Sequence, residues 1–413
     1  MNRAPRAVPL LAVLTLINLL NYLDRYVIAG IKQPLCDALK LDGKQYGLLT
    51  FAFMITYMLA SPAAGYLGDR VPRKYLIAAG VVVWSLATAA SGLAHDSTHL
   101  FLARAFTGVG EAGYATVAPG LISDLFTRDR RGKMMAVFYS AIPVGSALGF
   151  VTGGMVAVHL GWRYAFYVAG APGLVLAMVA LALPEPARGA CDPDPESALA
   201  PPPLKEGLRA LAGNGQFMFV NAGYALLTFA IGGLASWMPD FFVSVHGVAL
   251  DAAGTVFGAI TVVSGFLGTA AGGWAGERAV RRRAGGYLWI SGLGLLLSLP
   301  LVLVTAYAPA LGVAYGAAAL AMFFLFFNTG PINTALVNCV PANLRALAVA
   351  LDIFCIHLFG DAISSFILGA ISDAAGRQAA VAFTAVPIAV GGVVLLIGAR
   401  KANGSPLAPQ AAA

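Results

Sequence analysis

Long apolar stretches alternate with short polar segments along almost the whole chain. A helix needs about 20 apolar residues to cross a bilayer, and twelve stretches reach that length. The pattern therefore predicts twelve transmembrane helices, with glycine and proline inside them as such helices tolerate. The predicted spans are about 8–31, 44–68, 75–94, 98–125, 132–157, 163–184, 214–243, 251–276, 285–307, 310–336, 345–371 and 377–399.

The first apolar stretch follows Arg3 and Arg6, an arrangement that is also typical of a signal peptide. The apolar run continues to Gly30, however, and no small-x-small cleavage site closes a short hydrophobic region. We therefore interpret it as an uncleaved first transmembrane helix.

One long polar segment, at about 184–213, interrupts the pattern and is rich in proline, alanine and acidic residues. Such a composition predicts a flexible linker, with a short amphipathic helix over 204–211. The predicted division is a six-helix bundle at 1–187, a cytoplasmic linker at 188–212 and a second six-helix bundle at 213–413. The expected fold class is thus all-α integral membrane, with two six-helix halves as in one transporter architecture.

Composition and charge support a membrane protein and exclude several other classes. The chain is 59% hydrophobic and only 11% charged, far from the composition of a soluble protein. Its net charge of +7 is explained by topology, because 19 of the 26 lysines and arginines fall in segments on the side of the N-terminus. Both termini are therefore expected in the cytoplasm, and no nucleic-acid partner is expected. Four single cysteines offer no metal or redox spacing, so we expect neither metal nor cofactor.

Two charged residues stand out inside the fourth predicted span. Arg104 and Glu111 are seven residues apart, which returns them to nearly the same face of a helix. A charge at the middle of a membrane costs about 2.5 to 3.5 kcal/mol, so two on one helix imply partners, water or a function. The first predicted span adds Asp24 and Arg25.

The loop after the second span carries a recognisable pattern. Gly65-x-x-x-Asp69-Arg70-x-x-Arg73-Lys74 resembles the loop signature of the major facilitator superfamily, with Pro72 where a small residue is usual. An acid here can lie near the positive N-terminal end of a facing helix, while the arginines pair with carboxylates and hold the cytoplasmic side closed. The resemblance implies that this helix is the eleventh, which begins near Arg345. Ordinary loop charges are the alternative. The second half has a weaker counterpart, Glu277 and Arg278 after a glycine-rich helix end.

Glycines recur at every fourth position in the fifth span, at Gly145, Gly149 and Gly153. Small residues with this spacing let a neighbouring helix approach closely. The stretch resembles the superfamily's fifth-helix motif, which implies packing against the eighth helix.

Three further stretches resemble the Spinster-like transporters, and the resemblance covers nearly the whole chain. They are 21–26 (NYLDRY), 110–119 (GEAGYATVAP), and 357–364 (HLFGDAIS) followed by 369–373 (GAISD). Ser365 stands where animal Spinster proteins usually have proline, so the chain resembles a bacterial-type member.

This resemblance implies alternating-access export of amphipathic lipids such as lysophospholipids or sphingosine phosphate, with proton coupling. It also implies that the first and fourth helices are neighbours. Asp24 and Glu111 could then share Arg25 and Arg104, which makes the two acids candidate proton carriers. A static network of buried salt bridges that only fixes helix packing is the alternative.

The resemblance further implies that the first, fourth, seventh and tenth helices line a cavity. A polar pocket beside an aromatic one would suit an amphipath, although phenylalanines that face lipid need no ligand. His357 and Asp361, four residues apart in the eleventh span, could touch this cavity, support the gate or only contact another helix. The predicted cavity residues are Tyr22, Tyr114, Asn221, Tyr224, Thr228, Phe324, Asn328, Asn333, His357 and Asp361.

Two other functions are alternatives to lipid transport. A drug or small-metabolite antiporter of the same fold is one, because the cavity residues do not name a ligand. A membrane lipid-modifying enzyme is the other, but no nucleophile, base and orienting group fall together in the sequence. We expect a monomeric transporter in the cell (inner) membrane, whose partners are an amphipathic or lipid substrate, protons and membrane lipids.

Overall fold

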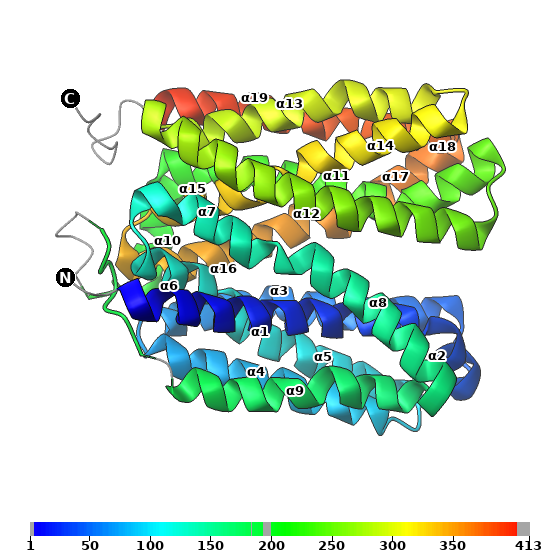
Figure 1. Cartoon of the computed structure of the whole chain (residues 1–413), viewed down its shortest axis with the longest axis horizontal. Helices are drawn as coiled ribbons and strands as arrows, with labels where there is room; N and C mark the ends of the chain where they lie inside the picture. The colour runs from blue at the N-terminus through cyan, green and yellow to red at the C-terminus, as the bar shows by residue number, and fades with distance from the viewer. Residues whose placement is uncertain (1–3, 183, 193–199, 403–413) are drawn as a thin grey trace. The chain divides into compact units, whose positions relative to one another are not determined.

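The computed structural model describes residues 4–182, 184–192 and 200–402, and all regular structure in those ranges is helical (Figure 1). A 3₁₀ turn at Ala342–Leu344 and a π turn at His357–Asp361 lie at the two ends of α16. The α-helices are α1 (Ala4–Gly30), α2 (Lys32–Leu39), α3 (Gly43–Gly68), α4 (Arg73–Gly92), α5 (Ser97–Ala115), α6 (Ala118–Leu125), α7 (Arg128–Tyr139), α8 (Ala141–Leu160), α9 (Trp162–Ala182), α10 (Leu204–Gly213), α11 (Gly215–His246), α12 (Leu250–Arg282), α13 (Gly286–Tyr307), α14 (Leu311–Phe326), α15 (Thr329–Asn338), α16 (Arg345–Ile356), α17 (Ala362–Ala375), α18 (Arg377–Phe383) and α19 (Ala385–Ala402).

Eleven helical stretches of the described residues are long and apolar enough to cross a membrane. They coincide with eleven of the twelve predicted spans, which confirms an all-α integral membrane fold. The fourth predicted span is not among them. It is built from α5 and α6, which are separated at Thr116 and Val117, and its apolar character is interrupted by Arg104, Glu111 and Asp124. The short helix predicted within the polar segment is confirmed as α10.

Several helices begin where the sequence supplies a capping side chain. The Asp42 carboxylate accepts from the Gln45 amide at 2.7 Å, and the Gln45 side chain accepts from the Asp42 amide, forming a capping box at the start of α3. Asp96 caps α5 through the amide of His99 at 2.8 Å. These caps fix where the spans enter the membrane region.

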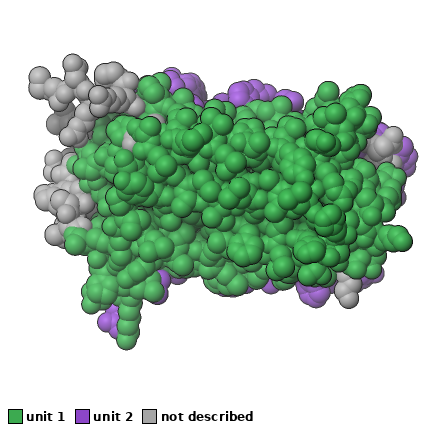
Figure 2. Space-filling model, turned by 90° about the horizontal axis from the view of Figure 1, so that it is seen from below, with its two compact units in different colours: residues 1–127, 141–207, 341–354 green, residues 128–140, 208–340, 355–413 purple. Residues whose placement is uncertain are grey.

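Packing divides the chain into two compact units, which are coloured green and purple in Figure 2. Unit 1 holds residues 1–127, 141–207 and 341–354, and unit 2 holds the remainder. The start of the eleventh predicted span therefore packs with helices of the first half of the chain, while α7 packs with the second half. The domain boundaries predicted in chain order, 187/188 and 212/213, stay a prediction.

Within unit 1, the glycine stripe of α8 packs along α1. A Cβ atom on Gly145 or Gly149 would lie 2.5 Å from the carbonyl oxygen of Leu19 or Leu23, respectively. Only glycine permits that approach. Within unit 1 the stripe thus serves contact with the first span, whereas its predicted packing against the eighth span stays a prediction.

Within unit 2, glycines also bring helix backbones together. A Cβ atom on Gly292 of α13 would lie 2.8 Å from the carbonyl oxygen of Gly392 on α19. Gly273 of α12 lies against α7, where a Cβ atom would be 3.1 Å from the carbonyl oxygen of Gly132. Contact between the fifth and eighth spans is thus made through α7, upstream of the glycine stripe.

Candidate functional site

The four charged residues predicted inside the membrane lie together in unit 1, and we call them the charge cluster: Asp24, Arg25, Arg104 and Glu111. Arg25 donates to the Glu111 carboxylate through Nη2 at 2.5 Å and through Nε at 3.2 Å. This two-point contact joins α1 to α5. The Glu111 side chain is fully buried and that of Arg25 is 14% exposed.

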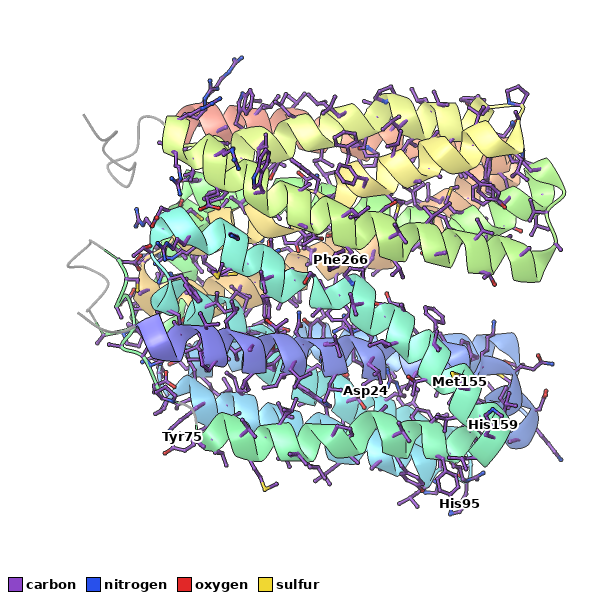
Figure 3. All side chains as sticks on the ribbon, in the orientation of Figure 1. Asp24, Tyr75, His95, Met155, His159 and Phe266 are labelled. Carbon is purple, nitrogen blue, oxygen red and sulfur yellow. The ribbon has the colours of Figure 1, made fainter. Side chains whose placement is uncertain are left out.

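The second pair of the cluster is looser. The Asp24 Oδ1 and Arg104 Nη1 atoms are 4.0 Å apart, and both side chains are buried. Asp24 lies on α1 (Figure 3), where its Oδ2 accepts a hydrogen bond from the Thr88 hydroxyl at 2.5 Å. Asp24 is thus held by a hydroxyl of α4 more closely than by an arginine.

Several buried atoms of the charge cluster have unused hydrogen-bonding capacity. Among the described residues, Oδ1 of Asp24, Oε1 of Glu111, and Nε and Nη1 of Arg104 have no hydrogen-bond partner. Leaving such a group unsatisfied costs about 1 to 3 kcal/mol. The cluster is therefore not a saturated salt-bridge network, and it can accept a proton or rearrange its pairs without first breaking every contact.

Aromatic rings surround the guanidinium of Arg25. Its Cζ atom lies 4.8 to 4.9 Å from the ring centres of Tyr22, Phe53 and Tyr57. Phe53 also lies 5.0 Å from the Arg104 guanidinium. A cation over such rings is stabilised by their negative faces. Of these rings, sequence reasoning singled out only Tyr22.

Three polar side chains of unit 2 form a chain of hydrogen bonds. The Tyr139 hydroxyl donates to Oδ1 of Asn333 at 2.8 Å, and Nδ2 of Asn333 donates to the Tyr224 hydroxyl at 2.9 Å. Two predicted cavity residues on α11 and α15 are thereby brought together, joined by a tyrosine of α7 that was not predicted. Phe324 belongs to a neighbouring group of rings, with centres 5.2 Å from Phe323 and 6.3 Å from Phe327.

Other predicted cavity residues make packing contacts. The Tyr114 hydroxyl donates to the Leu14 carbonyl at 2.5 Å, and its ring packs edge-on against Trp84. Asn328, in the break between α14 and α15, is buried and donates to the Phe324 carbonyl of α14. Asn221 is 9% exposed, and Thr228 lies against the π turn. Tyr114 and Asn328 are therefore positioned as structural contacts.

His357 and Asp361 pair within the π turn that separates α16 from α17. The His357 Nδ1 atom is 3.0 Å from the Asp361 carboxylate. Between them Gly360 has φ −102° and ψ −107°, outside the helical region. A Cβ atom at Gly360 would lie 3.0 Å from the Ala225 carbonyl oxygen, so this turn packs tightly on α11. Of the open readings, contact with another helix is the one that these distances support.

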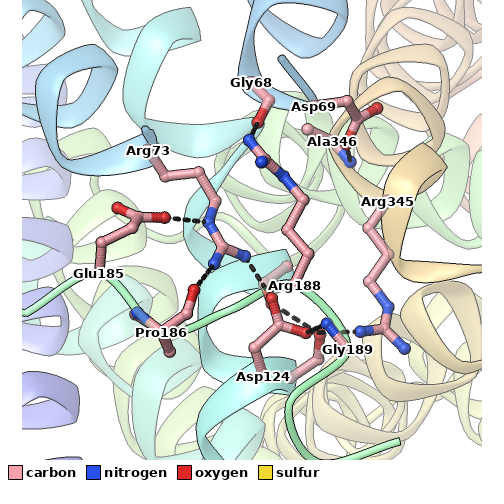
Figure 4. Close-up of polar contacts among 12 residues, drawn as sticks. Gly68, Asp69, Arg73, Asp124, Glu185, Pro186, Arg188, Gly189, Arg345 and Ala346 are labelled. Carbon is pink, nitrogen blue, oxygen red and sulfur yellow. Dashed lines mark hydrogen bonds and ion pairs between the residues drawn. The ribbon is translucent and has the colours of Figure 1, made fainter. Parts of the chain in front are cut away.

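A second group of polar contacts, the helix-end network, lies at the ends of α3, α4 and α6 in unit 1 (Figure 4). The Asp69 carboxylate accepts from the amides of Ala346 and Leu347, each at 2.9 Å. These amides open α16, where the helix dipole favours a negative charge. Gly65 permits the approach, because a Cβ atom there would lie 2.5 Å from the Ala346 carbonyl oxygen.

Asp124, at the end of α6, is the centre of this network, and sequence reasoning missed it. Its carboxylate accepts from Arg73, from the Arg345 guanidinium at 2.8 Å and from the Gly189 amide at 2.9 Å. Asp124, Arg73 and Arg345 are all buried. Asp124 is an acidic residue at the end of a predicted span, the same signal that drew attention to Glu111.

Residues after α9 complete the network. Glu185 accepts from Nε of Arg73 at 2.8 Å and from the Lys74 amide at 3.1 Å. Arg188 donates to the carbonyls of Gly68 and Val71 at 3.0 and 2.7 Å, where α3 ends. Asp192 pairs with Arg345. Much of the segment 185–192, which sequence reasoning placed at a flexible boundary, is therefore fixed against α3, α4 and α16.

Comparison with known proteins agrees with this geometry. Residues 14–360 match the Major Facilitator Superfamily. The Drosophila melanogaster protein spinster is 36% identical over 88% of this chain and 61% of its own length, and the mouse sphingosine-1-phosphate transporter is 35% identical over 88% of this chain and 69% of its own. The chain belongs to the Spinster-like group of the major facilitator superfamily. It is a multi-pass membrane transporter rather than an enzyme.

Solved structures support the fold of this Spinster-like transporter. The crystal structure of a bacterial homologue of the human lysosomal transporter Spinster, in an inward-facing and unoccupied conformation, covers 98% of this chain and 99% of its own, with a TM-score of 0.69. Its sequence identity is 24%, so it supports the fold alone.

Two details of the loop signature differ from the expectation for this transporter. Arg70 pairs with no carboxylate among the described residues. It donates to the carbonyls of Tyr66 and Pro202 and lies over the Tyr66 ring. The second-half counterpart is also different. Glu277 pairs with the exposed Arg281 of its own helix at 3.1 Å, and Arg278 lies over the Trp274 ring.

The contact between Asp69 and α16 is expected to strengthen as the pH falls. Burial raises the pKa of Asp69 from 3.8 to about 7, although two amides, Arg188 and Arg70 oppose that shift. Because the raised pKa belongs to the packed state, packing takes up a proton between about pH 4 and 7. The contact therefore weakens as the pH rises through this interval, and above pH 7 it weakens no further. Hydrogen exchange at the Ala346 and Leu347 amides, corrected for intrinsic rates, should show about tenfold greater protection at pH 6 than at pH 8.

The matched variant for this measurement is Asp69→Asn, which keeps the shape of the side chain but cannot titrate in this range. Its protection should be lower than that of the parent at pH 6 and independent of pH. Equal pH dependence in the parent and the variant would assign the titration to another group.

Proposed function

We propose that this transporter moves an amphipathic lipid, such as a lysophospholipid or a sphingosine phosphate-like molecule, by proton-coupled alternating access. The observation that carries the proposal is the charge cluster, in which two buried carboxylates share two arginines and keep free hydrogen-bonding capacity. Acidic residues buried among membrane helices are typical of proton pathways. Asp24 and Glu111 are the proposed proton carriers.

The two pairs of the cluster are suited to different parts of a transport cycle. Oε2 of Glu111 accepts from two nitrogens of Arg25, whereas Asp24 lies 4.0 Å from Arg104 and depends on the Thr88 hydroxyl. A carboxylate with a weak partner can become neutral at smaller electrostatic cost than one in a two-point ion pair. We therefore assign the first protonation to Asp24, with Glu111 following when Arg25 moves.

A lipid substrate is supported by the character of unit 2 and by a relative. Hydrogen-bonding groups of Tyr139, Asn333 and Tyr224 occur in the same unit as the ring group around Phe324. Polar and aromatic surfaces in one unit suit a molecule with a polar head and an apolar tail. The mouse relative is named for transport of sphingosine-1-phosphate, which has this character.

The helix-end network is proposed to be the cytoplasmic gate. Asp69 holds the first turn of α16 against α3 by accepting from two of its amides, and Asp124 holds it against α6 through a charge-assisted hydrogen bond from Arg345. The excess of basic residues in loops on this side supports its placement in the cytoplasm, with both termini there and the protein in the inner membrane.

Transport into liposomes tests the proposal. Purified protein is reconstituted, an inward or outward pH gradient is imposed, and radiolabelled lysophosphatidylcholine and sphingosine phosphate are followed together with internal pH. Lipid movement should require the gradient and be accompanied by movement of protons. Glu277→Gln, which removes a carboxylate from an exposed ion pair, is the matched control and should behave as the parent.

Two results would contradict the proposal. Accumulation of a water-soluble organic anion in the same liposomes, with no lipid movement, would favour the drug or metabolite antiporter. Lipid movement that is unchanged when the pH gradient is collapsed would exclude proton coupling while leaving the lipid substrate intact.

A further inference from the structure

A groove lies between α4 and α5 of unit 1, and no residue of the charge cluster or of the helix-end network lines it. It encloses about 590 Å³, within the range of roughly 300 to 1,000 Å³ that is typical of small-molecule sites. The two helices are in close contact at one end of this groove, where a Cβ atom on Gly110 would lie 2.8 Å from the Gly80 carbonyl oxygen. Beyond that contact, small side chains of Ala87, Ala90 and Ala103 leave the space open.

The walls of the groove are apolar and open toward the bilayer. Leu86, Leu93, Leu102 and Phe106 line it and are 50% to 63% exposed. Large apolar side chains exposed along membrane-spanning helices contact lipid hydrocarbon, because water would be unfavourable there. An acyl chain is therefore the occupant that the walls favour.

One end of the groove has a different chemistry. His95, in the turn between α4 and α5 (Figure 3), and His99, in the first turn of α5, line it, and both are exposed. Between them Asp96 pairs with His99 Nδ1 at 3.0 Å. The hydrogen bond from the His99 amide also lowers the pKa of Asp96, which is therefore ionised at neutral pH. The turn therefore carries one carboxylate, toward which His99 directs its Nδ1–H, and a second imidazole, that of His95, whose N–H remains available as a donor.

We propose that this groove is a binding site for a phospholipid with a primary amine in its headgroup, of the phosphatidylethanolamine class. One acyl chain lies along the alanines between α4 and α5, the ammonium group contacts Asp96, and the His95 imidazole N–H donates to the phosphate. A headgroup that is anionic and lacks an amine meets the Asp96 charge without compensation. This site is separate from the proposed transport pathway and does not depend on it.

The test is native mass spectrometry of the purified full chain titrated with phosphatidylethanolamine or phosphatidylglycerol of identical acyl chains. The parent should bind phosphatidylethanolamine about tenfold more tightly, a difference of about 1.4 kcal/mol. Asp96→Asn removes the charge but retains a good helix cap, so it should abolish that preference without unfolding α5. Equal binding of the two lipids by the parent, or an undiminished preference in the variant, would overturn the headgroup assignment.

Ala90→Trp tests the groove itself, because the added ring fills it from an exposed position. Binding of phosphatidylethanolamine should fall about tenfold, whereas Val175→Trp, on the exposed face of α9, should leave it unchanged. Unchanged lipid binding in Ala90→Trp would place the lipid elsewhere. A parent dimer that this variant dissociates, with lipid binding unchanged, would make the groove a contact between two copies of the chain. Because the measurement is binding, its failure is independent of any failure of transport.

Discussion

Replacing Glu111 by glutamine is expected to abolish proton-driven lipid uptake while the protein remains folded. Glutamine has the same length and can still accept a hydrogen bond from Arg25, which the rings of Tyr22, Phe53 and Tyr57 continue to stabilise. It cannot exchange a proton, however. Uptake in liposomes under an imposed pH gradient should fall to about a tenth of the parent rate or less.

The matching change at the other acid, Asp24→Asn, distinguishes a cluster that carries protons from one that is only structural. Asparagine can keep the hydrogen bond with the Thr88 hydroxyl, so this change also removes mainly the charge and the proton. If both residues carry protons, each variant loses pH-dependent transport, and lipid exchange without a gradient survives. If the cluster is only structural, both variants should show a lower melting temperature but undiminished pH dependence of transport, and the proton-carrier role would be wrong.

The sequence could predict the fold because hydropathy records the requirement that a membrane imposes on each helix. Eleven spans followed from apolar length alone. The fourth span was predicted as continuous, but its charges interrupt the apolar pattern and its helix is divided at Thr116 and Val117. Packing partners were less accessible, since a glycine stripe indicates that some helix approaches closely but not which one. The stripe at Gly145 and Gly149, for example, packs against α1, a partner that the sequence pattern alone did not identify.

The charge cluster could be predicted from the sequence because charged residues are rare in membrane spans, and each charged residue there indicated a partner. Only half of the helix-end network could be predicted from the sequence. Asp69 was found through its motif, but Asp124 and the contacts of Glu185 and Arg188 depend on where the chain returns after α9, which no local pattern records. Thr88 gave no signal at all, because one hydroxyl among small residues is ordinary in a membrane helix.

Asp124 has contacts that make it the most sensitive position of the proposed gate. Its carboxylate faces two buried guanidinium groups, and each of these has one further acidic partner: Glu185 for Arg73 and Asp192 for Arg345. Removing the shared carboxylate leaves each arginine with a single partner. Glu185 is 25% exposed, so its compensation of Arg73 is weakened by solvent.

Asp124→Asn should therefore release α16 from α6, whereas loss of the Glu277 carboxylate, whose ion-pair partner Arg281 is 62% exposed, should not. Breaking a buried ion pair by removing one partner costs about 3 to 5 kcal/mol, and the lower figure is more than a hundredfold in the ratio of open to closed forms. Hydrogen exchange over 345–350 should accelerate accordingly in Asp124→Asn and stay at the parent rate in Glu277→Gln. A double-mutant cycle with Arg345→Met would assign the coupling to that pair. Parent-like exchange in Asp124→Asn would mean that the amide contacts of Asp69 alone hold α16 in place.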